Sequence, residues 1–488
     1  MRISFGTEGW RAIIGDVFTF DNIKKFAKAV ANWLYWSERA KLDIYSKECT
    51  EGKSFKYTSP SAGVAIGYDT RFLSDKFAEV VADVISSCGI PVSLSSSFCS
   101  SPAVSNYVLK KKLSAGLIIT ASHNTYEYNG IKFKGEYGGS AISEIKWGIE
   151  KMIFSKKSYI PNDIPKAYIK RVSFDELYTE ETVSFVDMER IANARFKIIS
   201  DSIYGSASGL MRKFFHSVGV FIDEIRNNID PLFGGYTPEP IVRNIGPLMK
   251  KILKNRADIG FAFDGDADTV GAVDSQGSFL QSYDIMSILL WHLVENRKLE
   301  GDVVSSFSSS QLLKQMANAY GLSYHETPVG FNHITNLMLR HNILIGGEES
   351  GGIGIKMGIP DKNGPLVALL LLEAMVYSNK SISEIKSDIV DRFGLYCLHR
   401  TDILFKNNDE KDEVISKFCT KMPSSFADEK IKDVYTLDGI KCILEDGSWI
   451  LFRPSGTEPV FRIYAEASSH EKSYKMLNEC ESFIKKIL

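Results

Sequence analysis

The chain has 488 residues, and a typical domain size of ~150 residues predicts three or four domains. Apolar residues make up 44% and charged residues 24%, which excludes a largely disordered or collagen-like chain. The 58 lysines and arginines nearly balance the 60 aspartates and glutamates, for a net charge of -2. This balance argues against a nucleic-acid-binding protein, which usually has a strong basic excess.

Hydropathy and cysteine usage bear on location. The longest strongly apolar run, Val367 to Leu372, stops at Glu373, far short of the ~20 residues of a membrane helix. The residues that follow Met1 lack the hydrophobic core of a signal peptide. Seven scattered cysteines without a C-x-x-C pair are typical of reduced thiols. We therefore expect a cytoplasmic protein without disulfides, a zinc site or membrane contact.

The first 150 residues alternate between strand and helix patterns. Short apolar strands are predicted at 64–66, 92–94 and 116–120, and Ser74 is expected to cap a helix between the first two. Residues 37–62 are polar and lack periodicity, so a long surface loop is expected there. Strands that alternate with helices indicate an α/β layer structure.

An apolar run that ends in Asp recurs at 64–69, 196–201 and 259–264. Each run precedes a turn and a helical pattern, which suggests three similar modules, although any α/β protein has such runs. Shifts in composition and periodicity predict four domains. They are 1–165, which holds a serine-containing turn, a second α/β domain at 166–257, 258–380 with an acidic turn and a glycine-rich loop, and a small α+β domain at 381–488.

Asp264, Asp266 and Asp268 stand at alternate positions directly after an apolar run. Carboxylates at this spacing on a glycine-containing turn can converge on one hard cation, and oxygen ligands suit Mg²⁺. An EF-hand is excluded, because its sixth position must be Gly and its twelfth Glu, and these are Thr269 and Ser275 here. The pattern predicts a magnesium site, with a solvated acidic turn as the alternative.

Ser122 and His123 follow the predicted strand at 116–120. A turn at a strand end can present a hydroxyl to a substrate, so Ser122 is a candidate nucleophile. The G-x-S-x-G motif of α/β-hydrolases is missing. Hydrogen bonding within a turn remains an alternative role for both side chains.

A glycine-rich loop at 346–352 contains Glu348, Glu349 and Ser350. Carboxylates and hydroxyls accept hydrogen bonds from sugar hydroxyls, and the carboxylates are poor partners for phosphate. The loop is therefore a candidate sugar site, and a flexible exposed turn is the alternative.

A second loop, near the C-terminus, has the composition of an anion site. Two guanidiniums can bind a phosphate bidentately, while hydroxyls and turn amides donate further hydrogen bonds. A hairpin loop with surface arginines is the alternative. The candidate residues are Arg453, Ser455, Gly456, Thr457 and Arg462.

Taken in order, these motifs resemble the α-D-phosphohexomutases, a family that includes phosphoglucomutases and phosphomannomutases. An ordered set over nearly the whole chain is far more specific than any single motif. The matching segments are Phe5 to Arg11, Gly67 to Arg71, Thr120 to Asn124, Asn129 to Lys132, Asp264 to Asp268, Gly347 to Gly351, and Arg453 to Thr457 with Arg462.

The resemblance implies an α/β fold with three similar α/β modules and a C-terminal α+β domain of TATA-binding-protein-like fold, around a central cleft. It implies that Ser122 carries a phosphoryl group, with His123, Lys132 and Arg11 nearby for proton transfer and charge stabilisation. Further roles follow for two groups of residues. Mg²⁺ would be held by Ser122, Asp264, Asp266 and Asp268, and substrate by Glu348, Ser350, Arg453, Ser455, Gly456, Thr457 and Arg462.

The implied activity is interconversion of hexose 1-phosphate and hexose 6-phosphate through a bisphosphate, with hexose 1,6-bisphosphate as activator. The Glu-Glu-Ser form of the loop at 348–350 resembles phosphoglucomutases and favours glucose. A phosphomannomutase, a dual-specificity mutase, a weakly catalytic sugar-phosphate-binding homologue and a serine-dependent phosphatase are the alternatives. The partners are small-molecule hexose phosphates, and the oligomeric state stays open.

This chain departs from the family pattern where cations are usual. Thr269 stands in place of Arg and Asn332 in place of Lys, and Thr125 replaces a proline. We expect slower turnover, or that another cation takes over, with Lys356 and Lys362 as candidates. Restoring both cations in the double variant Thr269→Arg, Asn332→Lys is expected to raise activity if the missing charges limit the reaction.

Overall fold

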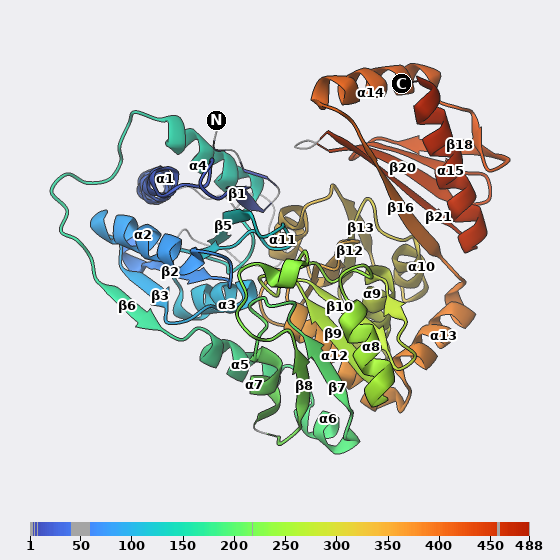
Figure 1. The fold of residues 1–488 in the computed structure, drawn as a ribbon, viewed down its shortest axis with the longest axis horizontal. Coiled ribbons are helices and arrows are strands. Elements are labelled where there is room, and N and C mark those ends of the chain that lie inside the picture. The colour runs from blue at the N-terminus through green and yellow to red at the C-terminus, as the bar shows by residue number, and fades with distance from the viewer. Residues whose placement is uncertain are drawn as a thin grey trace.

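The computed structural model describes residues 3, 5–6, 8–40, 59–216, 218–455 and 459–487. Its strands form four sheets that follow one another along the chain, each with helices packed on it (Figure 1). Most of the loop expected at 37–62 lies outside the described residues, and helix α1 (Phe20–Ala40) extends through its first four positions. The five cysteines whose side chains are described are all free and buried.

The first sheet has the order β1-β5-β4-β2-β3-β6, with β2 parallel to β3 and β4, and β5 antiparallel to β4 and β1. Helices α1, α2 and α4 share one apolar core with it, and α3 packs on the other face. The bounds are β1 (Gly9–Ile13), β2 (Val64–Tyr68), β3 (Val92–Ser95), β4 (Ala115–Ile119), β5 (Tyr128–Gly135), β6 (Ile169–Val172), α2 (Ser74–Ser87), α3 (Ser101–Lys111) and α4 (Ser143–Phe154).

The second sheet has the order β11-β10-β9-β7-β8. The expected boundary at 257/258 cuts this sheet, because β9 pairs in parallel with β7, so the turn of Asp264 belongs here. The boundary at 165/166 also moves, because β6 pairs with β3 of the first sheet. The bounds are β7 (Ile198–Asp201), β8 (Ile222–Ile225), β9 (Ile259–Phe263), β10 (Val270–Asp274), β11 (Phe279–Leu280), α5 (Asp175–Ser184), α6 (Met188–Ala194), α7 (Leu210–His216) and α8 (Gly246–Asn255).

The third sheet has the order β13-β12-β14-β15 and packs around the strongly apolar helix α12 (Gly364–Ser378). Helix α13 (Ile382–Phe393) packs on α9 and α12, so the expected boundary at 380/381 moves past it. The remaining bounds are α9 (Ser282–Trp291), a π-helix (His292–Asn296), β12 (Asp302–Ser306), α10 (Leu312–Ala319), β13 (Tyr324–Thr327), α11 (Phe331–Arg340), β14 (Ile343–Gly347) and β15 (Ile353–Ile355).

Among the described residues, no single helix is long and apolar enough to cross a membrane. Helices α12 and α13 pass that test only as a pair, bent by 77° at the break between them.

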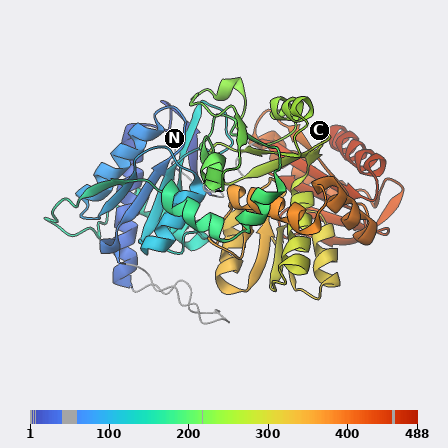
Figure 2. The same ribbon diagram turned by 90° about the horizontal axis from the view of Figure 1, so that it is seen from below.

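The fourth sheet is entirely antiparallel, in the order β16-β21-β20-β19-β18-β17, and packs with two helices around its own apolar core. Seen from below, the first and fourth domains lie at opposite ends of the molecule (Figure 2). Three α/β domains followed by an α+β domain confirm the predicted fold class. The bounds are β16 (Cys397–Leu404), α14 (Asn408–Lys421), β17 (Ser425–Phe426), β18 (Glu429–Tyr435), β19 (Ile440–Leu444), β20 (Trp449–Pro454), β21 (Val460–Ala467) and α15 (His470–Ile487).

Candidate active site

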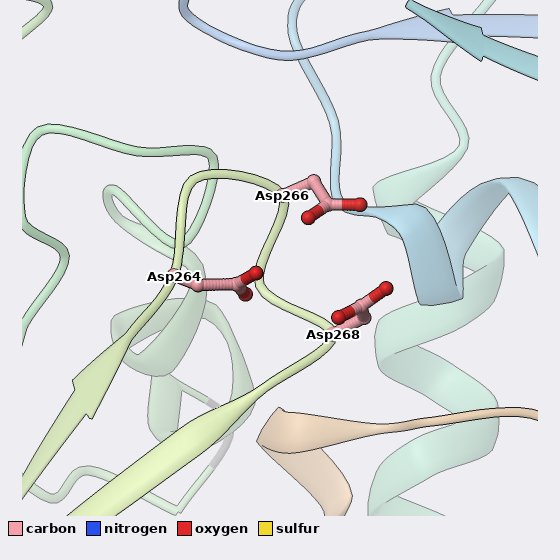
Figure 3. Close-up of side chains that lie close together, drawn as sticks. All are labelled: Asp264, Asp266 and Asp268. Carbon is pink, nitrogen blue, oxygen red and sulfur yellow. The ribbon is translucent and has the colours of Figure 1, made fainter. Parts of the chain in front are cut away.

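The acidic turn connects β9 to β10, which pair as an antiparallel hairpin. Asp264, Asp266 and Asp268 each offer an oxygen within 4.8 Å of the others, and each residue is at most 1% exposed. Figure 3 shows the three side chains projecting from this one turn. Because the three side chains are buried, the alternative of a solvated acidic turn is wrong. Buried like charges also require compensation by nearby positive charge.

Charge compensation in this turn is uneven. Burial raises the pKa of Asp264 well above its usual value, and Asp266 and Asp268 add to the rise. Burial also acts on Asp266, but Lys132, through its charge and a hydrogen bond, and Ser101 together lower its pKa. A crowded set of hard oxygen donors with one carboxylate hard to ionise fits a divalent cation such as Mg²⁺.

Ser122 lies directly against this turn. Its Oγ donates to Asp264 Oδ2 at 2.7 Å, although the two residues are 142 positions apart along the chain. Ser122 has a φ of +51°, which is unfavourable for a residue with a Cβ atom. A Cβ on Gly265 would lie 2.4 Å from Ser122 O, so glycine allows the serine turn and the acidic turn to meet. Sequence analysis predicted this pair, and the fold brings it together.

Lys132 lies on β5 beside the two turns. Its Nζ is 2.7 Å from both Asp266 Oδ2 and Asp268 Oδ2, and 3.4 Å from Glu8 Oε2. Burial lowers the pKa of Lys132, but the three carboxylates outweigh burial and raise it above the usual value. Lys132 therefore stays charged.

Lys362 is a second buried cation beside these carboxylates. We call Glu8, Asp266 and Asp268, with Lys132 and Lys362, the carboxylate cluster. Its Nζ is 2.5 Å from Glu8 Oε1 and 3.2 Å from Asp268 Oδ1. Burial raises the pKa of Glu8, but Lys362, Lys132 and Arg11 outweigh it and hold that pKa well below its usual range. Glu8 was not singled out from the sequence, although it lies within the matching segment Phe5 to Arg11.

Arg11 and His123 flank the serine turn. Arg11 Nη1 donates to Asn124 Oδ1 at 2.8 Å, and Arg11 Nη2 is 3.8 Å from Glu8 Oε2. Desolvation by the surrounding protein lowers the pKa of His123, and the positive charges of Arg11 and Lys362 lower it further, to about 3. The His123 side chain is nevertheless exposed, so solvent reduces this shift. An unshifted imidazole would also be mostly neutral above pH 7.

The predicted sugar loop lies between β14 and β15. Glu348 Oε1 accepts the Gly330 amide at 2.9 Å. Burial, opposed by Lys362 and reinforced by Glu8 and Glu349, raises the pKa of Glu348 to about 8.

Its neighbour Glu349 faces the fourth domain. Glu349 accepts from Ser308 Oγ at 2.7 Å and from Tyr464 Oη on β21 at 3.0 Å. Ser350 is exposed.

The predicted phosphate loop connects β20 to β21, and Gly456 and Thr457 lie outside the described residues. Arg453 and Arg462 are cross-strand partners at its base. Arg453 Nε donates to Asp438 Oδ2 at 2.8 Å, and the same oxygen accepts the Val329 amide of the third domain.

The buried Lys411 of α14 donates to Ser455 O at 2.7 Å. Sequence reasoning missed Lys411 and Asp438, because isolated charged residues in polar segments carry no local signal. No hydrogen bond or ion pair between described residues joins the phosphate loop to the acidic turn.

Thr269 and Asn332, the two positions at which a cation of the family pattern is missing, are buried. Thr269 donates its amide to Asp264 Oδ1 and its hydroxyl to Asp268 Oδ1, both at 3.0 Å. Asn332 is 2% exposed, and its Nδ2 lies 3.5 Å from Ser143 Oγ. Of the two candidate replacement cations, Lys362 lies in the carboxylate cluster, whereas Lys356 donates to Glu300 O at an exposed position.

Profiles of four protein families match successive parts of the chain. They are described as phosphoglucomutase/phosphomannomutase alpha/beta/alpha domain I (52–160), domain II (176–277), domain III (281–393) and C-terminal domain (417–479).

Similar proteins cover almost the whole chain. A phosphoglucosamine/phosphogalactosamine mutase of Sulfurisphaera tokodaii is 28% identical over 484 residues, or 98% of each chain. A phosphoglucomutase/phosphomannomutase of Thermococcus kodakarensis is 29% identical over 414 residues, which are 85% of this chain and 88% of that one. The crystal structure of a candidate phosphomannomutase from Thermus thermophilus superposes with a TM-score of 0.82 at 29% identity, over 99% of both chains.

Proposed function

Because this chain belongs to the phosphoglucomutase/phosphomannomutase family of intramolecular phosphotransferases, we propose that it interconverts hexose 1-phosphate and hexose 6-phosphate through a phosphorylated Ser122. One observation carries the proposal. Ser122 Oγ lies 2.7 Å from Oδ2 of Asp264. Asp264 belongs to the turn of three buried carboxylates, beside which Lys132 lies. A hydroxyl beside a hard-cation site suits phosphoryl transfer, because this chemistry depends on positioning and on stabilisation of charge.

In the proposed reaction, the bond between phosphorus and Ser122 Oγ breaks while a bond forms to a hydroxyl of the bound hexose monophosphate. The hexose bisphosphate turns over, and its other phosphoryl group returns to Ser122. In this proposal neutral His123, next to the serine, takes the proton of the attacking hydroxyl, and the cations Lys132 and Arg11 stabilise the charge of the transferring group. The bisphosphate is also the activator, because it phosphorylates Ser122.

Ser122, Asp264, Asp266 and Asp268 would hold Mg²⁺. When bound, the metal supplies positive charge opposite the transferring phosphoryl group. The protein contributes a buried donor set whose carboxylates Lys132 holds in place, with Nζ 2.7 Å from two of them.

Substrate recognition divides between the third and fourth domains. In this proposal Glu348 binds sugar hydroxyls, with the exposed Ser350 beside it. The non-reacting phosphate binds to the loop between β20 and β21. The residues proposed to hold it are Arg453, Ser455, Gly456, Thr457 and Arg462.

For the sugar, we propose glucose from the Glu-Glu-Ser form of the loop, with glucosamine as the second candidate. The S. tokodaii relative and a Prochlorococcus marinus relative, 28% identical, are both named for glucosamine phosphates. Burial raises the pKa of Glu348 to about 8, and Glu8 and Glu349 add to the rise, so an ammonium group at the 2-position would also be favoured beside these carboxylates. Mannose, alone or beside glucose, is the remaining sugar.

A coupled assay with glucose, mannose and glucosamine 1-phosphates, in the presence of Mg²⁺ and the matching bisphosphate, tests the proposal. We expect 6-phosphate formation without release of inorganic phosphate, fastest with glucose. A preference for glucosamine would select the second candidate. Phosphate release without isomerisation would identify a phosphatase, and sugar-phosphate binding without turnover would identify a binding homologue. Either of these last two results would reject the mutase.

A further inference from the structure

Arg71, in the turn after β2, lies beneath the serine turn with a side chain that is 0% exposed. Its Nη2 donates to Ser122 O at 2.5 Å and to Asn124 O at 2.6 Å. Its Nη1 donates to Thr125 O at 2.8 Å and to Tyr128 O at 3.1 Å. One planar guanidinium thus binds four backbone carbonyls of the segment that carries Ser122, a fork geometry that lysine cannot reproduce.

The ion pair of Arg71 with Asp69 also fixes the amide of Ser122, through Thr120. Arg71 Nε lies 3.2 Å from Asp69 Oδ2, and that oxygen accepts the Thr120 hydroxyl at 2.6 Å. Thr120 Oγ1 in turn accepts the Ser122 amide at 2.9 Å. Asp69 and Arg71 therefore fix both the N–H and the C=O of Ser122.

This support matters because the Ser122 backbone is strained. A non-glycine residue at a φ of +51° persists only where its surroundings over-determine the conformation. Ser122 O also forms the contact with the acidic turn, since a Cβ on Gly265 would lie 2.4 Å from it and 3.6 Å from Arg71 Nη2. A shift of that carbonyl would move the serine hydroxyl relative to Asp264.

The turn that carries Thr70 and Arg71 is anchored to the second domain. The Arg71 guanidinium lies over the ring of Phe233, 4.9 Å from its centroid. The neighbouring Thr70 donates its hydroxyl to Tyr204 O at 2.8 Å. The residues that hold Ser122 are therefore tied to the domain that provides the acidic turn.

We propose that Arg71 is a positioning residue for phosphoryl transfer, which holds the strained Ser122 backbone in register with the acidic turn without touching substrate. The proposal rests on the proposed function of Ser122 as phosphoryl carrier. Arg71 contributes to the rate at which Ser122 accepts and returns a phosphoryl group, and not to the binding of the hexose phosphate.

The test compares Arg71→Lys with Arg226→Lys. Arg226 is a matched control, because its side chain is 7% exposed, forms a two-nitrogen pair with Asp201 and lies 4.9 Å from the Tyr236 ring centroid. We measure Ser122 phosphorylation by glucose 1,6-bisphosphate with time-resolved intact mass, together with kcat, KM and Tm.

We expect Arg71→Lys to lower the phosphorylation rate and kcat by about tenfold to a hundredfold, because small misplacements of reacting groups cost rates of this order. KM should stay within about threefold, since uniform substrate binding is unaffected. Arg226→Lys should change Tm but not the phosphorylation rate. Rates for Arg71→Lys equal to wild type, or equally reduced in both variants, would overturn the proposal.

Should Arg71→Lys fail to fold, Thr120→Val decides, because it removes the acceptor of the Ser122 amide and keeps the side-chain volume. It should slow phosphorylation in the same way, and wild-type rates would refute the positioning role. Failure of the proposed function looks different, because wild type itself would then acquire no phosphate from the bisphosphate.

Discussion

Replacing Lys362 with methionine removes one buried cation from the carboxylate cluster and keeps a side chain of similar length. The lost contacts are those of Nζ with Glu8 Oε1 at 2.5 Å and with Asp268 Oδ1 at 3.2 Å. Both carboxylates keep Lys132, at 3.4 Å and 2.7 Å, so neither is left without a cation.

The expected magnitude follows from these contacts. Breaking a buried ion pair typically costs ~3–5 kcal/mol, and the remaining contacts of Lys132 place this variant near the lower end, at ~3 kcal/mol of stability. Lys362 is 6% exposed, so solvent screens these contacts little. Under the hypothesis that Lys362 replaces a missing cation, it would make one charge-assisted contact to the transferring phosphate. Such a contact contributes ~1.5–3 kcal/mol, so its loss would lower kcat/KM about tenfold to 150-fold.

The assay is the coupled mutase reaction, with urea unfolding monitored in parallel. Lys356→Met is the matched control, because Lys356 is exposed and donates to a surface carbonyl, that of Glu300. Lys362→Arg keeps the charge and should retain most of the activity. If Lys362→Met keeps wild-type kcat/KM and stability, or if Lys356→Met loses as much, Lys362 does not compensate for the missing cations at Thr269 and Asn332.

Three further predictions follow from the site. Asp266→Asn should raise the Mg²⁺ concentration needed for half-maximal activity and lower kcat by orders of magnitude, and an unchanged Mg²⁺ titration would show that the turn binds no metal. Gly265→Ala should abolish most activity, because its Cβ would lie 2.4 Å from Ser122 O, whereas Gly246→Ala, with open space around the added Cβ, should be harmless; equal effects would contradict the packing argument. Glu348 has a folded pKa of about 8, above the unfolded value of ~4.3, so its ionisation favours unfolding. Between pH 5 and pH 8, metal-free wild type should therefore lose stability relative to Glu348→Gln by at most ~1.4 kcal/mol per pH unit, and parallel stability curves would refute this assignment.

The alternation of strands and helices predicted an α/β fold, and the family resemblance that the ordered motifs carry implied that Ser122 meets Asp264. Motifs at strand ends can be found from sequence, because an apolar run followed by polar residues marks the edge of a sheet. The sheet to which a strand belongs could not be found in this way. Strand β9 follows a polar segment that looks like a domain boundary, yet it pairs with β7, and parallel pairing between distant segments leaves no local pattern.

Supporting residues were harder to predict than reacting ones. Glu8, Asp69 and Arg71 lay in segments already compared with the family, but their roles depend on contacts with side chains or carbonyls far away along the chain. The search for a cation that could replace the missing ones shows the same limit. The sequence offered both Lys356 and Lys362 as candidates. The contacts of the turn before α12 distinguish them, because Lys362 pairs with Glu8 whereas Lys356 contacts the carbonyl of Glu300.

The most direct test of the central claim is the intact mass of wild type and Ser122→Ala after incubation with glucose 1,6-bisphosphate and Mg²⁺. Wild type should acquire one phosphate, which it loses again when excess glucose 6-phosphate is added. Ser122→Ala should remain unmodified while it still binds the hexose phosphate. Equal phosphorylation of both proteins, or no phosphorylation of wild type, would contradict the assignment of Ser122 as the phosphoryl carrier.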